Sequence, residues 1–262
     1  MALCWESAPR TLDMKIIPLA MLAFGLLAPR SNSATLIRVD FEGLGPVSYG
    51  IVPGVFHNGS FDAFNSGETA SPALEALAEH GSPLRLLSTV PAGANPSIIA
   101  NGSAGAGISG TSLVSVKDGN GFFSFAAKLL PSNDWFIGND TGFDASSLLG
   151  TSAGTMLTFN VSTVWDAGTE LEDFGYSSGN SLFPGLIGGI PGGGVAQNGV
   201  ISEVTSSNPF SFFSNQPDGF NPQSLNFSGN PVARFTLTVV PEPSSAGLQG
   251  LAVLSLLLRR KR

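Results

Sequence analysis

Short runs in which apolar and polar residues alternate are the feature that most restricts how this chain can fold. In residues 35–44, Ile37, Val39 and Phe41 share one side of an extended chain, and charged residues such as Arg38 occupy the other side. A side-chain period of two is typical of a half-buried β-strand. Further strands are expected at residues 111–116, 122–130, 155–165, 200–204 and 232–240.

Stretches rich in glycine and proline separate these runs. The chain has 33 Gly and 18 Pro, together 51 of 262 residues, which favours turns and loops over long helices. Residues 117–121, KDGNG, predict a hairpin turn between two strands. Irregular structure is expected through residues 45–68, 91–109, 184–199 and 209–229.

One helical insertion interrupts the strands. Ser71 is a suitable N-cap with proline after it, Leu74 and Leu77 share one face, and Gly81 ends the helix. A second short helix is expected within residues 83–90. Spaced strands with a single helical insertion predict a mainly β fold, an antiparallel β-sandwich.

Charge and cysteine content narrow the class of protein further. The formal net charge is −7, but residues 35–240 alone contain 5 basic and 16 acidic residues, which gives −11. Phosphate binding requires clustered Lys and Arg, so no nucleic-acid partner is expected, whereas cations are compatible with this charge. Cys4 is the single cysteine, so the chain can form no internal disulfide, and packing must hold the fold.

The N-terminal segment predicts export. After Met14 and a lysine, residues 16–28 are apolar and residues 31–34 are small, which is the pattern of a secretory signal peptide. We expect residues 1–34 to be this signal, with translation starting at Met14 because the acidic Glu6 fits poorly before it. An ordinary buried helix is the alternative.

Residues 241–262 form a distinct tail. It consists of a proline–glutamate motif, a 13-residue apolar run at 246–258 and a basic end, in that order: Pro241, Glu242, Pro243, then Arg259, Arg260, Lys261 and Arg262. As a helix the apolar run is about 20 Å long, against a hydrocarbon core of about 30 Å. The run is therefore short for a permanent membrane span.

This tail resembles the PEP-CTERM sorting signal. The resemblance implies a Gram-negative bacterium that makes extracellular polysaccharide, and an exosortase that processes the protein near the PEP motif. The basic end is expected to stay on the cytoplasmic side, so the short helix would anchor the chain transiently in the inner membrane. A plain C-terminal anchor without processing is the alternative.

Three stretches of the body resemble the spondin N-terminal domain family, known from F-spondin. They are FNSGETASPALEALAEHGSPL at 64–84, KLLPSNDWFIGND at 128–140 and VWDAGTELEDFG at 164–175. Their order makes the resemblance fairly specific, and it covers roughly residues 35–240. It implies an eight-stranded, C2-like β-sandwich.

The resemblance also implies a calcium ion near one end of the sandwich. Carried onto this sequence, its ligands are Asp134, Asp166 and Glu170; the glutamate is one methylene longer than the family's aspartate. Calcium prefers six to eight oxygen ligands, including carboxylates and backbone carbonyls. From the residues alone, aspartates that hydrogen-bond their own turns are the alternative.

Two further features bear on sugar or lipid binding and on hydrolase activity. Trp135 and Trp165 adjoin the proposed ligands and either plug the core or form an exposed surface for sugar or lipid. GTSAG around Ser152 matches a hydrolase motif, but a strand is expected after it, and the two histidines, His57 and His80, precede it in the chain.

The sequence therefore predicts a non-enzymatic, exported protein of the cell surface or extracellular matrix, with a role in adhesion or biofilm. Its expected partners are the exosortase and extracellular polysaccharide or other surface proteins. The alternatives are an exported carbohydrate- or lipid-binding module and, less favoured, an exported serine hydrolase.

Overall fold

The computed structural model describes residues 34–44, 48–101, 109–130, 132, 134–171, 195–204 and 230–241. The chain divides into two units, Met1–Ser33 and Ala34–Arg262, and all the described residues belong to the second. The predicted signal peptide and tail lie outside the described residues, apart from Ala34 and Pro241. Within these ranges, no helix is long and apolar enough to span a membrane.

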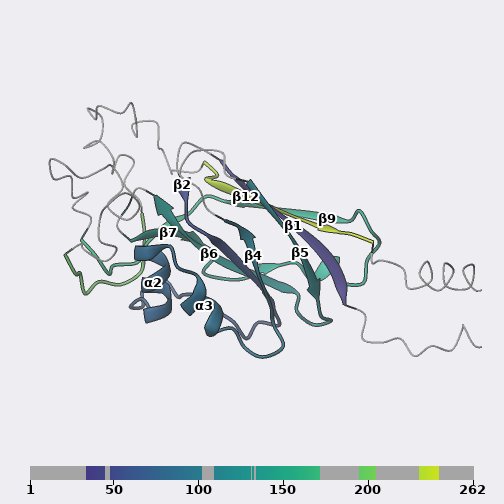
Figure 1. Ribbon diagram of the computed structural model, residues 1–262, viewed down its shortest axis with the longest axis horizontal. Helices are drawn as coiled ribbons and strands as arrows, with labels where there is room; N and C mark the ends of the chain where they lie inside the picture. The colour runs from purple at the N-terminus through teal and green to yellow at the C-terminus, as the bar shows by residue number, and fades with distance from the viewer. Residues whose placement is uncertain are drawn as a thin grey trace, which may run out of the picture. The chain divides into compact units, whose positions relative to one another are not determined.

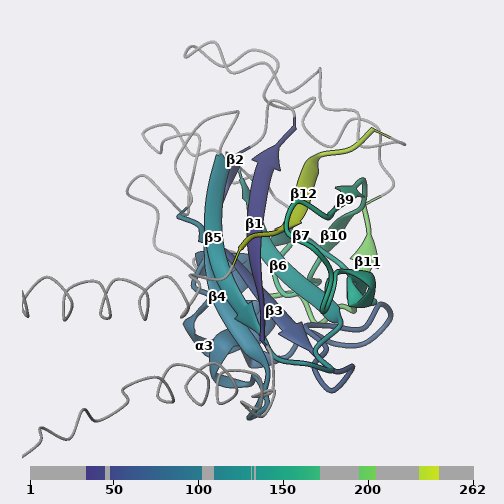
Figure 2. The same cartoon turned by 90° about the vertical axis from the view of Figure 1, so that its right-hand side faces the viewer.

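Four antiparallel strands form the first sheet. Their order across the sheet is β5 (Ser109–Val116), β1 (Thr35–Gly43), β12 (Ala233–Val239) and β9 (Met156–Val161), and Figure 2 shows them side by side. In β1, Ile37, Val39 and Phe41 are buried, and the residues between them are more exposed. The alternation predicted for this strand is confirmed.

The second sheet has eight strands built around β6. Six of them follow the order β11 (Ser202–Glu203), β10 (Val164–Asp166), β7 (Trp135–Gly138), β6 (Phe122–Leu130), β3 (Val52–His57) and β4 (Asn95–Ala100), while β2 (Ser48–Tyr49) and β8 (Phe143–Asp144) also pair with β6. The described residues thus form twelve strands, several of them only two residues long, where eight were expected. The prediction of antiparallel sheets is confirmed.

Aromatic side chains fill the space between the two sheets. Phe235 of β12 contacts Phe125 of β6, with ring centroids 4.4 Å apart, and Phe123, with centroids 5.3 Å apart. Phe41 of β1 packs against Phe235 and against the edge of Tyr49. Both faces of β6 are covered, and eight of its nine residues are buried.

Two helices cover the outer face of the second sheet, as Figure 1 shows. They are α2 (Pro72–His80) and α3 (Leu84–Ser88); a single 3-10 turn, η2 (Ser146–Leu148), follows β8. Leu74 and Leu77 of α2 belong to the same buried cluster as Phe64 and Phe136. Ser71 Oγ accepts a hydrogen bond from the Leu74 N–H, so the predicted helix start is confirmed.

Two segments expected to be irregular contain strands. β3, with the sequence VPGVFH, is buried throughout, although Pro53 and Gly54 disfavour a strand. Pro53 lies at a register shift against β4, and a Cβ on Gly54 would come within 2.7 Å of the Phe123 ring. Packing of the Phe123 ring against the Gly54 backbone therefore outweighs the low strand preference of Pro53 and Gly54. β4, expected to be loop, is the edge strand that pairs with β3, where Pro96 is tolerated.

The hairpin prediction for residues 117–121 is wrong. The turn is present, with Gly119 at φ +91°, but β5 pairs with β1 and β6 pairs with β3 and β7. The turn therefore carries the chain from one sheet to the other. The single strand expected at residues 155–165 is likewise two strands, β9 and β10, which belong to different sheets.

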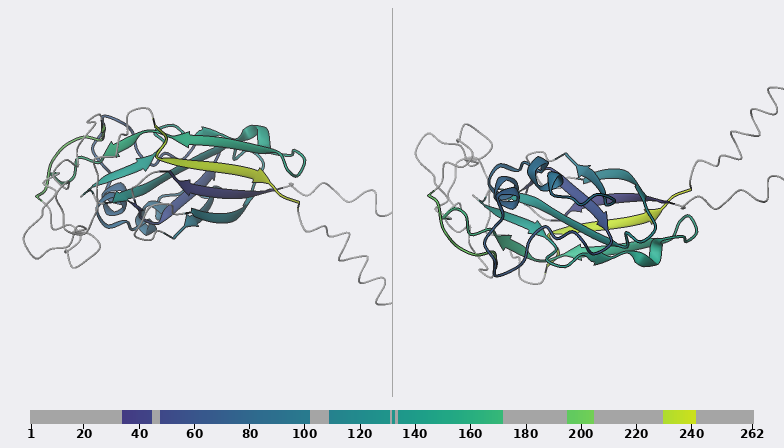
Figure 3. Two further views of the ribbon diagram at one scale, coloured as in Figure 1. Left: turned by 90° about the horizontal axis from the view of Figure 1, so that it is seen from above. Right: turned by 90° about the horizontal axis from the view of Figure 1, so that it is seen from below.

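The first and last described strands meet at one end of the sandwich. Ile37 lies opposite Val239, and the Val240 N–H donates to the Leu36 carbonyl at 2.9 Å (Figure 3). At the other end of this pair, the Tyr49 hydroxyl donates to the Val232 carbonyl. Tyr49 lies opposite Leu129 of β6, so this second end is where the chain leaves β6 for β7.

Candidate functional site

Two aspartates converge where β7 begins and β10 ends. The two strands are antiparallel, with Asp166 opposite Trp135, so Asp134 lies directly beside the end of β10. The Ala167 N–H donates to the Asp134 carbonyl at 3.3 Å, which extends the pairing by one step. The strand register thus brings together two residues that are 32 positions apart in the sequence.

Asp134 is fully buried and organises the loop after β10. Its Oδ2 accepts hydrogen bonds from the Thr169 N–H at 2.7 Å, the Thr169 hydroxyl at 3.1 Å and the Glu170 N–H at 3.0 Å. A buried carboxylate is tolerated when several donors surround it. Asp134 therefore has a structural role in this corner whatever else it binds.

Asp166 closes a tight turn of its own. Its Oδ1 accepts a hydrogen bond from the Gly168 N–H at 2.7 Å. Gly168 has φ +67°, and a Cβ there would lie 2.8 Å from the Val200 carbonyl oxygen. Burial raises the pKa of Asp166, and the negative charge of Asp134 raises it further. The two carboxylates are therefore close enough to repel each other.

Glu170 joins this corner through its backbone. Its N–H donates to Asp134, and it pairs with Ala196 in an antiparallel bridge. Neighbouring bonds, from Leu171 N–H to the Val195 carbonyl and from Gln197 N–H to the Thr169 carbonyl, continue the ladder. Glu170 is 7% exposed.

The oxygens of the two aspartates fit a hard cation as ligands only in part. Two adjacent carboxylates suit Ca²⁺, but one oxygen of Asp134 is already surrounded by three donors, so an ion would use other oxygens. Among the described residues, no three His, Cys, Asp or Glu side chains are grouped so that they could hold a metal ion. The assignment of Asp134, Asp166 and Glu170 as three calcium ligands stays a prediction.

Thr169 is the site residue that sequence reasoning did not single out, and Gly168 was considered only as part of the turn. Thr169 supplies two of the three donors to Asp134, and Gly168 lets the chain pass close to Val200. Both belong to the DAGT stretch at 166–169. The stretch was therefore informative as a hydrogen-bonded turn as well as a source of carboxylates.

The two tryptophans of this region pack into the protein. Trp135 is 4% exposed and belongs to the core between the sheets, so of the two interpretations the core plug is confirmed for this residue. Trp165 is half-buried, packs against Phe64 and donates from Nε1 to the Gly138 carbonyl at 3.1 Å. Both residues fix the loops of the corner.

The hydrolase motif at Ser152 acquires no histidine partner within the described part of the chain. His57 Nε2 lies 2.9 Å from the Ser124 hydroxyl, and its Nδ1 accepts a hydrogen bond from the Gly59 N–H at 3.1 Å. His80 is on α2, beside Glu79. A strand, β9, follows Ser152 where the motif requires a helix.

Comparison with known proteins supports the resemblance in the sequence. A search of curated proteins found no match. The family model Spondin_N matches residues 40–183, which is more than half of the chain and includes Asp134, Asp166 and Glu170. β12 lies beyond the matched residues, although it completes the first sheet. The chain belongs to the Spondin_N family.

Proposed function

We propose that this chain is a non-enzymatic, exported protein of the cell surface or extracellular matrix whose β-sandwich binds Ca²⁺. Membership of the Spondin_N family indicates an extracellular or secreted protein. Calcium binding, sorting and adhesion are the finer parts of the proposal, and each has its own test.

The aspartate pair at the β7–β10 corner carries the calcium part of the proposal. Burial makes it costly to keep Asp166 charged, and repulsion from Asp134 adds to that cost. A bound Ca²⁺ would supply the positive charge that offsets both effects. Asp134 and Asp166 would hold the ion with backbone carbonyls and water, and Glu170 is the third candidate ligand.

Calorimetric titration of the purified protein with Ca²⁺ tests this part. We expect Asp166→Asn to weaken binding by at least about tenfold, because it removes one of the charges while keeping the side-chain oxygen that accepts the Gly168 N–H. Asp144→Asn is the matched control, since Asp144 Oδ1 accepts the Ser146 N–H at 2.9 Å in a similar turn outside this corner. Absence of binding heat in the unchanged protein would refute the calcium site.

A Glu170→Gln variant asks whether this side chain is a ligand. A loss of affinity close to that of Asp166→Asn assigns the carboxylate to the ion. Unchanged affinity restricts Glu170 to the backbone role described above. The rest of the calcium site stands in either case, because it rests on the two aspartates.

The sorting part of the proposal rests on the tail at residues 241–262. A PEP-CTERM signal would anchor the chain transiently in the inner membrane of a Gram-negative bacterium until an exosortase releases it. Mass spectrometry of the native C-terminus, with cell fractionation, tests this. A C-terminus near Pro241, in surface or matrix fractions, supports processing, whereas an intact basic end in the inner membrane contradicts it.

We place the released sandwich in adhesion or the biofilm matrix, with polysaccharide or other surface proteins as partners. The acidic body favours calcium-bridged contacts with such partners over contacts with nucleic acid. Retention of the purified protein on matrix from the producing cells, with and without a calcium chelator, tests this role. A carbohydrate- or lipid-binding site built on Trp135 is not favoured, because that side chain is buried.

A further inference from the structure

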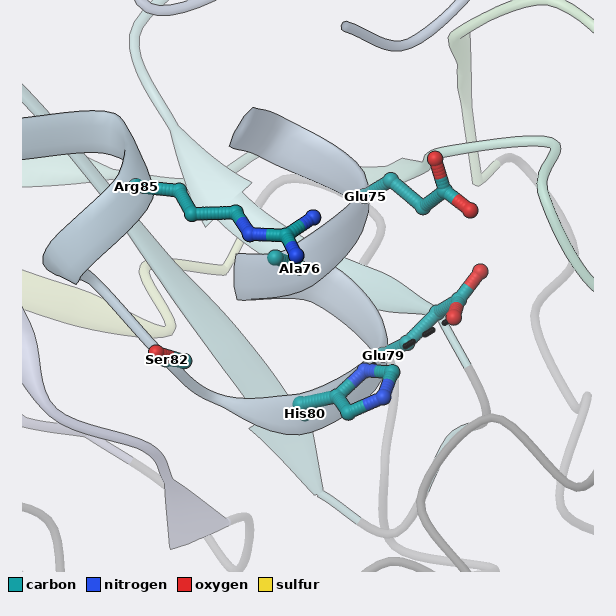
Figure 4. A pocket seen from close by; sticks show the side chains of 6 residues that line it. All are labelled: Glu75, Ala76, Glu79, His80, Ser82 and Arg85. Atoms are coloured by element: carbon teal, nitrogen blue, oxygen red, sulfur yellow. Dashed lines mark ion pairs between the residues drawn. The ribbon is translucent and has the colours of Figure 1, made fainter. Parts of the chain in front are cut away.

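A polar cleft lies between α2 and α3, the two helices on the outer face of the second sheet. Its volume is about 250 Å³, and its lining consists of Glu75, Ala76, Glu79, His80, Ser82 and Arg85. Figure 4 shows the Arg85 side chain reaching across from α3, with the carboxylates of Glu75 and Glu79 on the other side. The walls therefore carry charges of both signs.

These charges do not neutralise one another. No ion pair or hydrogen bond within the described residues joins Arg85 to Glu75 or Glu79. In Figure 4, Ala76 and the α2 ribbon lie between the Arg85 guanidinium and the two carboxylates. A guanidinium and two carboxylates that line one cleft, but do not pair, offer charge of both signs to a ligand bound there.

Glu79 is the strongest indication of a ligand. Its side chain is only 8% exposed, yet no donor among the described residues hydrogen-bonds to its carboxylate. The His80 imidazole lies beside it, with Nδ1 at 3.7 Å, which is beyond hydrogen-bond distance. The Glu79 carboxylate lines the cleft with no donor from the described residues, so a ligand that brings a donor can bind it without displacing a protein hydrogen bond.

The helix that carries both glutamates is held firmly. Ser71 caps its start, and Gly81, at φ +67°, ends it with an N–H bond to the Leu77 carbonyl. The ammonium of the buried Lys128 donates to the Ala78 carbonyl and ties the last turn of α2 to β6. The carboxylate wall of the cleft is therefore organised before any ligand arrives, which lowers the entropic cost of binding.

We propose that this cleft binds a small zwitterion of the amino-acid type. Its ammonium group would contact Glu79 and Glu75, and its carboxylate would contact Arg85. An ammonium offers three donors to the two carboxylates, and a guanidinium suits a carboxylate because both are planar and can form paired hydrogen bonds. The volume is below the roughly 300–1,000 Å³ of pockets for drug-sized ligands, so the ligand must be small.

An NMR titration of the purified protein tests the proposal. Glycine, β-alanine and γ-aminobutyric acid form a series in which the two charged groups are progressively farther apart. We expect one of them to cause saturable amide shifts at residues 75–85. Propylamine and propionate, which each carry one of the two charges, should bind at least about tenfold more weakly.

Variants identify the groups responsible. Glu79→Gln and Arg85→Gln should each weaken binding of the best zwitterion by at least about tenfold, and the exposed Glu75→Gln provides a variant with little risk to folding. Glu42→Gln and Arg234→Gln are the controls, because that ion pair, at 3.3 Å, lies on the β1–β12 surface. Thermal melting of each variant checks that the fold is intact.

Two results would overturn the assignment. One is the absence of saturable shifts with every member of the series. The other is equal binding of propylamine together with full affinity of Arg85→Gln, which would make the cleft a site for an ammonium group alone. Because neither result involves Asp166, the outcome is independent of the calcium titration.

Discussion

At the scale of single residues, Asp166 makes stability depend on pH. Burial and the neighbouring Asp134 raise its pKa in the folded protein above the ordinary value. The folded state therefore binds the Asp166 proton more tightly than the unfolded state does. The free energy of unfolding contributed by this residue falls as pH rises through the folded-state pKa, and at neutral pH without calcium Asp166 is a cost.

Asp166→Asn should therefore stabilise the protein in calcium-free buffer at neutral pH, by about 0.5–1 kcal/mol. Asp144→Asn should do the opposite, because hydrogen bonds from Ser146 lower the pKa of Asp144. Urea unfolding with a chelator present measures both. With saturating Ca²⁺, the unchanged protein should become more stable than Asp166→Asn. A free energy of unfolding that does not change with Ca²⁺ would contradict the site.

His57 should make the protein sensitive to mild acid. Burial lowers the pKa of His57, and its Nδ1 already accepts the Gly59 N–H, so protonation at Nδ1 removes that hydrogen bond. The folded state binds this proton less tightly than the unfolded state, in which the pKa is about 6.5. Stability from His57 is thus present above that pH and is lost as pH falls below it.

Urea unfolding between neutral pH and pH about 5 measures the effect. We expect the free energy of unfolding to decrease over this range, and the decrease to be smaller in His57→Gln. The glutamine cannot take up a proton, although it can keep a hydrogen bond to Ser124. An equal decrease in both proteins would assign the acid sensitivity to other groups.

At the scale of elements, the turn after β10 depends on Gly168. Gly168→Ala meets a backbone strain of about 1–2 kcal/mol and a contact with the Val200 carbonyl that a Cβ would make at 2.8 Å. We expect a total loss of about 3 kcal/mol or more in the free energy of unfolding. Gly67→Ala isolates the strain, since Gly67 has φ +85° and nothing lies within 4 Å of its Cβ position. Equal losses in the two variants would mean that the loop yields to the contact.

The local sequence was sufficient to predict those helices and strands whose capping residues or alternation lie within the element itself. The helix at Ser71 and the strand from Thr35 follow from a cap and from an alternation, and both are present. β3 could not be predicted, because the close packing of Gly54 on Phe123 involves a residue far along the chain. The same applies to the turn at Gly119, since a turn sequence does not state which strand each neighbour will pair with.

The candidate site also has some features that the sequence predicts and others that it does not. Asp134 and Asp166 come from motifs visible in the sequence, and the β7–β10 register brings them together. The three donors to Asp134 and the ladder between Glu170 and Ala196 are backbone features without a residue-type signature. The cleft between α2 and α3 depends on how two helices pack, and the sequence gives no direct sign of it.

At the scale of the whole molecule, β12 should be indispensable. It lies between β1 and β9 in the first sheet, yet it falls outside the family match at residues 40–183. A chain that ends at residue 183 would leave β9 without its partner and β1 paired only with β5, and would expose the core that Phe235 covers. We expect a fragment of residues 34–241 to unfold cooperatively, and a fragment of residues 34–183 to lack a cooperative transition by circular dichroism.

The pairing of β1 with β12 also determines how the sandwich responds to force. Leu36 and Val240 are joined by a hydrogen bond at the end where both strands leave the sandwich. Tension that pulls these two points apart acts across the ladder and opens its hydrogen bonds one after another, starting at that pair. Tension between this end and the β7–β10 corner acts along the strands and must break many bonds together. The protein should therefore unfold at low force when it is pulled between Leu36 and Val240. It should resist higher force when it is pulled between this end and the β7–β10 corner.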